Sequence, residues 1–293
     1  MAKTEFEQKI YDDVQQQKGT SFTVKASLLE RLLVKKTACT NLHPNAEDEF
    51  TFETVGPSMR IIGEYEQEFR KALKHNQDPF NDALIVEKLH PKGYLLLNGH
   101  HRWAAAMRCQ IKKVPIKIVN LAQDSDIEKI LENSKHDKRV TLDLDEVIFR
   151  GDKDKFVEKV PKFRLIKFKQ KLKLGVPALF HYLSKQGYDI WVYSAKYYSI
   201  DDIQRFFRAY SVHVDGIITG TEKRKASNSA SAVQREKLIA SKYKQTLHID
   251  NDMVLATGDI EGAKYKKYEL NVPDDQWSRK AIDVIGEIAK NGG

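Results

Sequence analysis

The chain has 293 residues, of which 41% are hydrophobic and 31% are charged, and its mean hydropathy is -0.54. This length accommodates two domains of ordinary size, each with a core of its own. No apolar run approaches the roughly 20 residues of a membrane span, and the first residues contain no signal-peptide core, so we expect a cytoplasmic protein with no membrane partner. The two cysteines, Cys39 and Cys109, have neither pairing nor metal-ligand spacing, which agrees with a reducing compartment.

The net charge of +8 is unevenly distributed along the chain. Residues 1–137 contain 20 Lys and Arg against 20 Asp and Glu, whereas residues 138–293 contain 29 against 21. In the segment 153–173, cationic side chains alternate with apolar ones, which predicts a strand or hairpin with one cationic face. Two interpretations are open: a solvated edge of a sheet, or a surface that contacts the phosphates of a nucleic acid. The cationic residues concerned are Lys159, Lys162, Arg164, Lys167, Lys169, Lys171 and Lys173.

The N-terminal part of the chain shows helical patterns followed by two strands. Apolar spacing at 5–17, 26–36 and 64–74 predicts helices, and the apolar runs at 83–89 and 94–97 predict strands joined by a turn. The second helix carries an apolar face, which we expect to pack on the domain behind it, with partner binding as the alternative. That face consists of Leu28, Leu29, Leu32, Leu33 and Val34.

The second of these strands leads into the box Asn98-Gly99-His100-His101-Arg102, and an alanine-rich helix follows. A glycine at this turn lets a ligand approach the backbone closely. The N–H groups at the start of the helix, together with Arg102, form an anion-binding end. The side chains of His100 and His101 diverge because the residues are adjacent, so a metal ion chelated by both is disfavoured.

The order of strand, Gly-His-His-Arg turn, alanine-rich helix and a further strand at 114–119 resembles the ParB/sulfiredoxin fold over roughly residues 50–122. Members of that family bind nucleotide phosphates with this box, so the resemblance implies ATP, ADP or CTP as the ligand. The box is most similar to that of free-serine kinases, Asp-Gly-His-His-Arg, with Asn98 in place of the acid. Sulfiredoxin has its reactive cysteine at the position of His100, which excludes sulfiredoxin chemistry.

A kinase of that family also needs a carboxylate base near the start of the domain. Glu64, Glu66 and Glu68 are the candidates, and a surface helix that carries all three for solubility is the alternative. The polar stretch 123–138, with a short amphipathic helix within it, is interpreted as a linker. It separates a first domain at 1–122 from a second domain at 139–293.

The second domain alternates apolar strands with helices, which predicts a parallel sheet with right-handed crossovers. Three of its strands end in polar residues: Asp143 and Asp145, then Ser194, then Asp250 and Asp252. Ligands of open parallel sheets bind beyond the carboxyl ends of the strands, so we expect these residues to form one site. Two neighbouring acids repel each other, and burying them is costly unless a cation offsets the charge. For the first pair alone, a helix-capping aspartate beside a surface one is the alternative.

The three strand ends resemble the motifs of the haloacid dehalogenase (HAD) superfamily of aspartyl phosphohydrolases. The first motif, Asp143-Leu144-Asp145-Glu146-Val147, is most similar to that of the phosphatases that act on the polymerase C-terminal domain. The resemblance implies that Asp143 attacks phosphorus, that Asp145 serves as acid and base, and that Ser194 binds a phosphoryl oxygen.

The same resemblance implies a Mg²⁺ ion and a lysine that neutralises the phosphate. Asp143, the backbone carbonyl of Asp145, and Asp250 are the expected metal ligands. The lysine is expected at Lys237, and Lys223 and Lys225 are the alternatives.

We therefore expect an α/β protein: an N-terminal ParB/sulfiredoxin-like α+β domain followed by a capless HAD-like Rossmannoid domain with a parallel sheet. The expected function is a Mg²⁺-dependent phosphatase coupled to a nucleotide-binding domain, with kinase activity in that first domain as an extension of the hypothesis. A large phosphorylated substrate is expected, such as a nucleic-acid end or a phosphoprotein. The alternative is a nucleotide-sensing, nucleic-acid-binding regulator without turnover.

Overall fold

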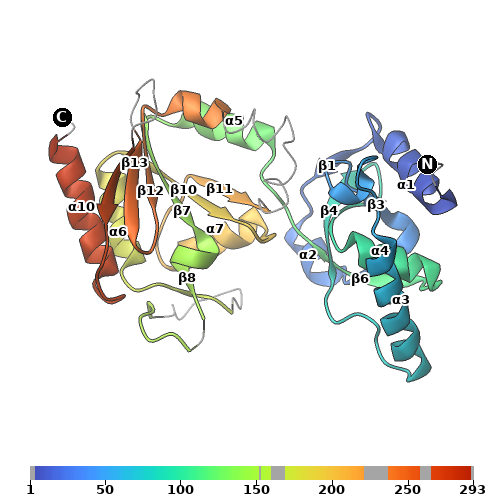
Figure 1. Ribbon diagram of the computed structural model, residues 1–293. Helices are drawn as coiled ribbons and strands as arrows, with labels where there is room; N and C mark the ends of the chain where they lie inside the picture. The colour runs from blue at the N-terminus through green and yellow to red at the C-terminus, as the bar shows by residue number, and fades with distance from the viewer. Residues whose placement is uncertain (1–3, 152, 160–168, 221–236, 258–264, 292–293) are drawn as a thin grey trace. The chain divides into compact units, whose positions relative to one another are not determined.

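The computed structural model describes residues 4–151, 153–159, 169–220, 237–257 and 265–291. The chain forms two compact units, Met1–Asn120 and Leu121–Gly293 (Figure 1). Each unit contains its own six-stranded sheet and its own buried core. None of the helices in the described ranges combines the length and the apolar character that a membrane crossing requires.

The first unit consists of α1 (Glu5–Gln17), β1 (Phe22–Val24), α2 (Leu28–Leu33), β2 (Lys36–Ala38), β3 (Leu42–Pro44), α3 (Met59–Lys74), β4 (Leu84–His90), β5 (Tyr94–Asn98), α4 (His100–Arg108) and β6 (Lys113–Ile118). Its mixed sheet has the order β2-β6-β4-β5-β3, with β1 paired to β4. Strand β4 runs parallel to β6 and antiparallel to β1 and β5. Helices α3 and α4 pack against each other, and their buried side chains join those of the sheet in one core.

Most N-terminal elements lie where the sequence predicts them. Helix α1 has the predicted bounds, and a capping box of Thr4 and Glu7 explains its start. Strands β4, β5 and β6 match the predicted strands, and the predicted turn joins β4 to β5. Helix α3 starts earlier than predicted because Ser58 caps it.

The four leucines of the predicted α2 face are exposed, so the prediction that they pack on their own domain is wrong, whereas Val34 of the same face packs against the core of the unit. Leu29 and Leu33 are 67% and 74% exposed. The charged side of the helix faces the unit instead: Arg31 is buried, and Glu30 forms an ion pair with Lys88 of β4. A capping box that includes Glu30 fixes the first turn, so the helix cannot rotate its leucines inward without losing these contacts.

The second unit consists of α5 (Asp124–Asn133), β7 (Lys138–Asp143), the helical turn η3 (Leu144–Ile148), β8 (Phe149–Arg150), β9 (Lys171–Leu172), α6 (Val176–Lys185), β10 (Tyr188–Ser194), α7 (Ile200–Ala209), β11 (Gly216–Thr219), β12 (Gln245–Ile249), β13 (Met253–Thr257), β14 (Tyr265–Glu269) and α10 (Trp277–Asn291). Its main sheet has the order β11-β10-β7-β12-β13-β14. The first four strands are parallel, and β13 and β14 extend the sheet in antiparallel fashion. The predicted α/β class and the predicted parallel strands are confirmed.

The strand order creates a topological switch point. Along the chain, the strands run from β7 through β10 to β11, and the chain then returns to the other side of β7 as β12. Ligands of such sheets bind beyond the carboxyl ends of the strands at this kind of switch point. A site is therefore expected where β7 and β12 end.

Helices cover both faces of this sheet (Figure 1). Helices α6, α7 and α10 pack on one face and form the larger core with it. Helix α5 and the short helix at 237–242 pack on the other face, around Trp191 and Ile218. Ile190 and Trp191 belong to opposite cores because successive side chains of a strand point to opposite faces.

The stretch 123–138, interpreted from the sequence as a linker, contains α5 and lies within the second unit. Ile127 and Leu131 of α5 are buried in the cluster around Trp191 and Tyr243. The amphipathic pattern predicts the helix but not the residues on which it packs, because those residues come from segments far along the chain.

Candidate functional site

Polar side chains meet at the carboxyl ends of the parallel strands. Strand β7 ends at Asp143, β10 ends at Ser194, and Asp250 follows β12 directly. Leu142 pairs with Ile249 across β7 and β12, so Asp143 and Asp250 occupy neighbouring positions on adjacent strands. The ordinary separation of such positions is about 4.8 Å. The structure thus brings the three predicted strand ends together at the switch point.

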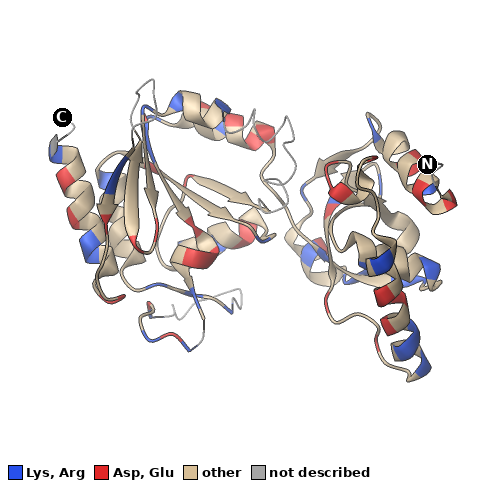
Figure 2. Ribbon diagram, viewed as in Figure 1, with Lys and Arg blue, Asp and Glu red and all other residues tan. Residues whose placement is uncertain are grey.

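Asp143 is oriented by the turn that follows it. Its Oδ1 accepts hydrogen bonds from the backbone N–H groups of Asp145 (2.7 Å) and Glu146 (2.8 Å). It therefore caps the turn Leu144–Ile148, and Figure 2 shows the acidic residues of this turn at the end of β7. Capping was the alternative role that the sequence left open for this aspartate. In the structure Asp143 caps the turn and also lies beside Asp250. The oxygen Oδ1 of Asp143 thus belongs to the cap.

The Asp145 carboxylate accepts hydrogen bonds from three side chains. Ser194 Oγ lies 2.5 Å from Oδ2, whereas Lys196 Nζ and Tyr198 OH lie 2.9 and 2.8 Å from Oδ1. Burial acts to raise the pKa of Asp145, but the bonds from these three groups outweigh burial and leave the pKa below its ordinary value. Asp145 is thus ionised at neutral pH, and its carboxylate faces the loop that follows β10.

Lys196 and Tyr198 were not predicted as site residues. Both follow Ser194 in the loop after β10, so the strand end that identified Ser194 also pointed to them. Desolvation raises the pKa of Tyr198, and the bond to Asp145 raises it further. Tyr198 therefore stays protonated and donates to Asp145.

Asn251 connects the end of β12 to the turn after β7 and to the hairpin of β8 and β9. Its Nδ2 donates to the Glu146 carbonyl (2.9 Å), and its Oδ1 accepts from Arg150 Nη2 (3.2 Å) and Lys173 Nζ (3.1 Å). These bonds bring two cations to the residue next to Asp250.

Lys173 is fully buried although it carries a charged group. Its Nζ lies 3.2 Å from Asp274 Oδ1 and 4.0 Å from the centre of the Trp277 ring, besides its bond to Asn251. Burial lowers the pKa of Lys173 to about 8, and the nearby Arg150 adds to this effect. The alternation of segment 153–173 could not reveal this burial, because the covering residues come from the start of α10.

The lysine predicted to neutralise the phosphate, Lys237, is exposed at the start of the helix at 237–242. Ile239 of the same helix packs in the α5 cluster. Lys223 and Lys225 lie outside the described residues. Lys173 is the lysine whose contacts include the neighbour of Asp250, which makes it a better candidate on geometry.

The carboxylates fit a Mg²⁺ site built from two acids. Mg²⁺ prefers oxygen ligands and is commonly bound by one or two carboxylates together with substrate phosphates. Asp143 and Asp250 are neighbours, and their charges repel unless a cation lies close. The Asp145 carboxylate already accepts three donors, so only its backbone carbonyl suits a metal. The described part of the chain contains no group of three or more His, Cys, Asp and Glu side chains that could bind a metal ion.

The basic segment 153–173 is described only at its two ends. Strands β8 and β9, of two residues each, pair antiparallel where this segment joins the rest of the unit. Lys173 is buried and so does not belong to the predicted cationic face, whereas Lys169 is exposed. Between them, Gln170 Nε2 donates to Tyr198 OH (3.5 Å), which brings this end of the segment to the site. Lys162, Arg164 and Lys167 lie outside the described residues.

In the first unit, the two histidines of the box contact different segments. His100 Nε2 accepts a hydrogen bond from the Asn45 N–H (3.3 Å), and His101 Nε2 accepts one from the Ser58 N–H (3.2 Å). The ring of Phe50 contacts both histidine rings, with centroid distances of 5.3 and 5.1 Å. The predicted divergence of the histidines is present, and both contribute to the structure of the loop between β3 and α3.

Gly99 begins α4 with a φ of 98°. A Cβ here would lie 2.5 Å from Leu84 Cδ2 and 2.9 Å from Arg102 Nη2, so both the turn and the packing of the chain's own side chains require glycine. Arg102 donates to the Asp82 carbonyl (2.8 Å) and to Asn98 Oδ1 (3.4 Å). Among the described residues, no side chain makes a cap hydrogen bond at the start of α4, and the anion site expected there stays a prediction.

The candidate kinase bases lie on α3. Glu66 forms ion pairs with Arg108 of α4 and with Arg70 (3.4 Å), and its side chain is only 13% exposed. Glu64 pairs with Arg60, is largely exposed and suits the solubility interpretation, as does the exposed Glu68. Glu66 therefore joins two helices.

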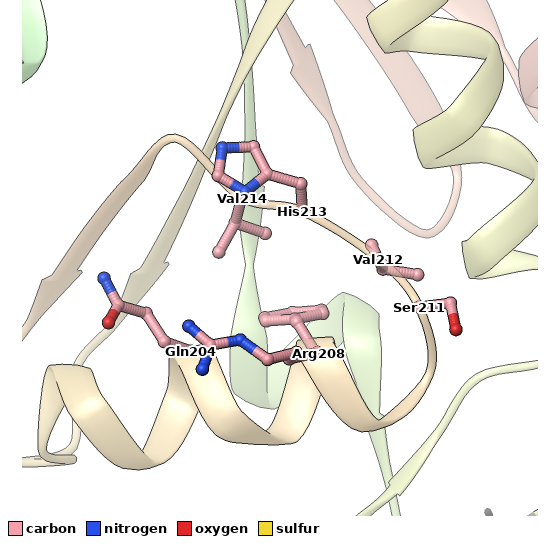
Figure 3. Close-up of a pocket in the computed structure, with 7 residues that line it drawn as sticks. Gln204, Arg208, Ser211, Val212, His213 and Val214 are labelled. Carbon is pink, nitrogen blue, oxygen red and sulfur yellow. The ribbon is translucent and has the colours of Figure 1, made fainter.

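A cavity of about 340 Å³ lies at the C-terminal end of α7 (Figure 3). Gln204, Arg208 and His213 are among its lining residues. Helix α7 starts beyond the carboxyl end of β10 and runs back along the sheet, so this cavity is separate from the carboxylates at the switch point.

In a comparison with protein families, residues 67–134 match a family model described as the ParB N-terminal domain. The matched segment begins within α3, contains the Gly-His-His-Arg box and ends with α5. No curated protein and no solved structure matches the chain. These comparisons support the ParB/sulfiredoxin-like part of the prediction and give no family for the residues that follow. Residues 67–134 are thus similar to the ParB N-terminal domain.

Proposed function

We propose that the second unit is a Mg²⁺-dependent hydrolase of phosphate monoesters that works through an aspartyl-phosphate on Asp143. The observation that carries the proposal is that Asp143 and Asp250 follow paired residues of β7 and β12 at the switch point, with the buried Lys173 bonded to Asn251 beside Asp250. This arrangement supplies a nucleophile and positive charge for a phosphate, and Asp145 supplies an acid and base.

In the first step of the proposed reaction, the carboxylate of Asp143 attacks phosphorus. The bond between this oxygen and phosphorus forms as the bond to the leaving alcohol oxygen breaks. Asp145 gives its proton to that oxygen. It takes up this proton when the substrate binds, because the nearby phosphate anion raises the pKa of the carboxyl.

In the second step, Asp145 accepts a proton from water as the water oxygen attacks phosphorus. The bond to Asp143 breaks, and inorganic phosphate leaves. Mg²⁺, bound by Asp143, Asp250 and the Asp145 carbonyl, would reduce the repulsion between the attacking carboxylate and the phosphate. Lys173 adds a fixed positive charge. The buried Ser194 gives its one hydroxyl proton to Asp145 and so orients that carboxylate.

For the first unit, the family match supports a function related to nucleotides or nucleic acids. We infer a nucleotide site for ATP, ADP or CTP at the start of α4, where N–H groups and Arg102 would contact phosphates. The ion pairs of Glu66 favour binding over kinase chemistry, because a catalytic base must be available to the substrate hydroxyl. A nucleotide-sensing, nucleic-acid-binding regulator without turnover is the second candidate, and the same match favours it.

The test measures phosphate release from p-nitrophenyl phosphate, nucleotides, phosphopeptides and phosphorylated oligonucleotides, with and without Mg²⁺. Asp143→Asn should lower the rate on the order of 10³-fold or more, because the nucleophile acts as a unit with the acid and the metal. The amide can still cap the turn after β7, so the variant should melt like the wild type. Asp283→Asn, a change of an exposed carboxylate on α10, is the matched control.

Retained turnover in Asp143→Asn would falsify the aspartyl-phosphate mechanism. No release from any substrate, together with nucleotide binding in calorimetry, would favour the regulator instead.

A further inference from the structure

Lys196 lies in the loop after β10 with its backbone fixed and its side chain exposed. Its N–H donates to Ser194 Oγ (3.0 Å), and its carbonyl accepts from the Gly220 N–H (3.0 Å). The side chain is 65% exposed, yet its Nζ lies 2.9 Å from Asp145 Oδ1. A solvent-accessible ammonium group is thereby placed next to the proposed acid.

The same carboxylate oxygen has a second neighbour. Tyr198 OH donates to Asp145 Oδ1, and Gln170 Nε2 donates to Tyr198 OH. Gln170 lies between Lys169 and Lys171 in the sequence. Gln170 therefore reaches Asp145 through Tyr198, on the β10 side of β7, whereas Asp250 follows β12 on the other side of β7.

We propose that Lys196 selects phosphate monoesters whose alcohol part carries a second phosphate group, as at the phosphorylated end of an oligonucleotide. The inference rests on the proposed hydrolase function and names the class of substrate for that site. If Asp145 protonates the leaving oxygen, the leaving alcohol lies against Asp145 and within reach of Lys196. A lysine is a compact charge on a flexible stem, so its ammonium group can follow a neighbouring phosphodiester while the loop stays in place.

The competing role for Lys196 is the orientation of Asp145 alone. In that role, replacing Lys196 would slow every phosphate monoester by the same factor, because Asp145 serves each of them in the same step. A contact to the second phosphate predicts a loss that depends on the substrate and appears mainly in KM. A ratio of two substrates therefore separates the two roles.

The experiment compares kcat/KM for p-nitrophenyl phosphate, which lacks a second anion, with kcat/KM for a 3′-phosphorylated oligonucleotide and a nucleoside 3′,5′-bisphosphate. In Lys196→Met, we expect the ratio of oligonucleotide to p-nitrophenyl phosphate to fall about 10- to 100-fold, the range for one charge-assisted hydrogen bond. Lys196→Arg should recover most of the ratio. Lys185→Met is the matched control, because Lys185 ends α6 before the amino end of β10 and should leave the ratio unchanged.

Each possible result either supports the proposal or overturns it. A fall in the ratio of the oligonucleotide to p-nitrophenyl phosphate, with no fall in the ratio for the bisphosphate, supports the proposal and identifies a nucleic-acid end. An equal fall in both ratios supports it with a mononucleotide as the source. Equal losses on all substrates would overturn it and assign Lys196 to orientation, and so would a wild type that prefers an acidic phosphopeptide. Hydrolysis of no substrate at all would instead overturn the proposed function, and the inference would fall with it.

Discussion

The burial of Lys173 lowers the stability of the protein, although the charge of Lys173 serves the proposed function. Its ammonium group is buried against one carboxylate, one amide and one aromatic ring. Such burial costs free energy for the charged form, which is why its pKa is lowered to about 8. A buried charge that is partly compensated is characteristic of functional sites, where a cation must meet an anionic ligand.

The cost of this burial depends on pH in a direction that can be worked out. The folded protein loses the Lys173 proton near pH 8, whereas the unfolded chain keeps it until about pH 10.5, the ordinary value. Between these values the unfolded state binds more protons, so the contribution of Lys173 to the free energy of unfolding rises with pH.

Lys173→Met should therefore be at least as stable as the wild type at pH 7, by up to about 1–3 kcal/mol, because an apolar chain of similar length replaces a buried charge. The difference should shrink as the pH approaches 10, while phosphate release falls at every pH. Urea unfolding at pH 7 and pH 9.5 measures this, with Lys185→Met as the control. A wild type that is more stable than Lys173→Met by the same amount at both pH values would contradict the prediction.

Some residues of the candidate site can be identified from the sequence next to them, whereas others depend on segments far along the chain. Asp143, Ser194 and Asp250 could be predicted because each directly follows or ends an apolar strand, and parallel strands collect their carboxyl ends at one edge. Lys173 could not be assigned from its own segment, because Asp274 and Trp277 bury it from the far end of the chain.

At the scale of elements, the same distinction separates α1 from α2. The bounds of α1 follow from a capping box and from spacing, both of which are local. The direction in which α2 faces depends on Lys88, an ion-pair partner supplied by β4. Spacing shows that a helix has two sides, but the long-range partner decides which side is covered.

Helix α5 forms part of a core of the second unit. Its residues Ile127 and Leu131 are buried, at 0% and 8% exposure, against Trp191 and Tyr243 of the second unit. A fragment 121–293 should therefore fold, whereas a fragment 139–293, cut at the boundary suggested by the sequence, should expose this cluster. Removing two buried aliphatic side chains costs about 2–5 kcal/mol each, so we expect the shorter fragment to unfold at a clearly lower temperature or to aggregate.

Thermal melting of the two fragments, followed by circular dichroism, provides the measurement. The double variant Ile127→Ala and Leu131→Ala in the full chain serves as a matched test without truncation, and Lys129→Ala on the exposed side of α5 is its control. Equal melting temperatures for the two fragments would restore the linker interpretation.

At the scale of the whole molecule, the placement of α5 changes how the charge is divided. With the boundary after Asn120, the first unit has 18 Lys and Arg against 15 Asp and Glu, and the second has 31 against 26. The contrast between a neutral first half and a basic second half thus becomes a small difference between two basic units. Net charge alone therefore does not indicate which unit binds nucleic acid. The cations around the site are the better indicator.

Lys169 and Lys171 belong to the basic segment and flank Gln170, which contacts Tyr198 of the site. If both lysines contact phosphates, each contact releases counterions, and the slope of log affinity against log salt should be shallower by roughly 0.7–0.9 for each lysine removed. Binding of a phosphorylated oligonucleotide to catalytically inactive Asp143→Asn protein, measured across a salt series, gives the slope with and without the changes Lys169→Gln and Lys171→Gln.

A double change of Lys185→Gln and Lys290→Gln removes the same charge from exposed positions of α6 and α10 and should leave the slope nearly unchanged, because these lysines lie outside the site. If the two double variants show the same slope, the segment is a solvated edge of the hairpin. The nucleic-acid end would then lose its electrostatic support, and a small nucleotide or a phosphoprotein would be the better substrate for the carboxylates at the switch point. A slope that changes only in the hairpin variant would place the polyanion beside Lys196, where the leaving group of the proposed reaction must lie.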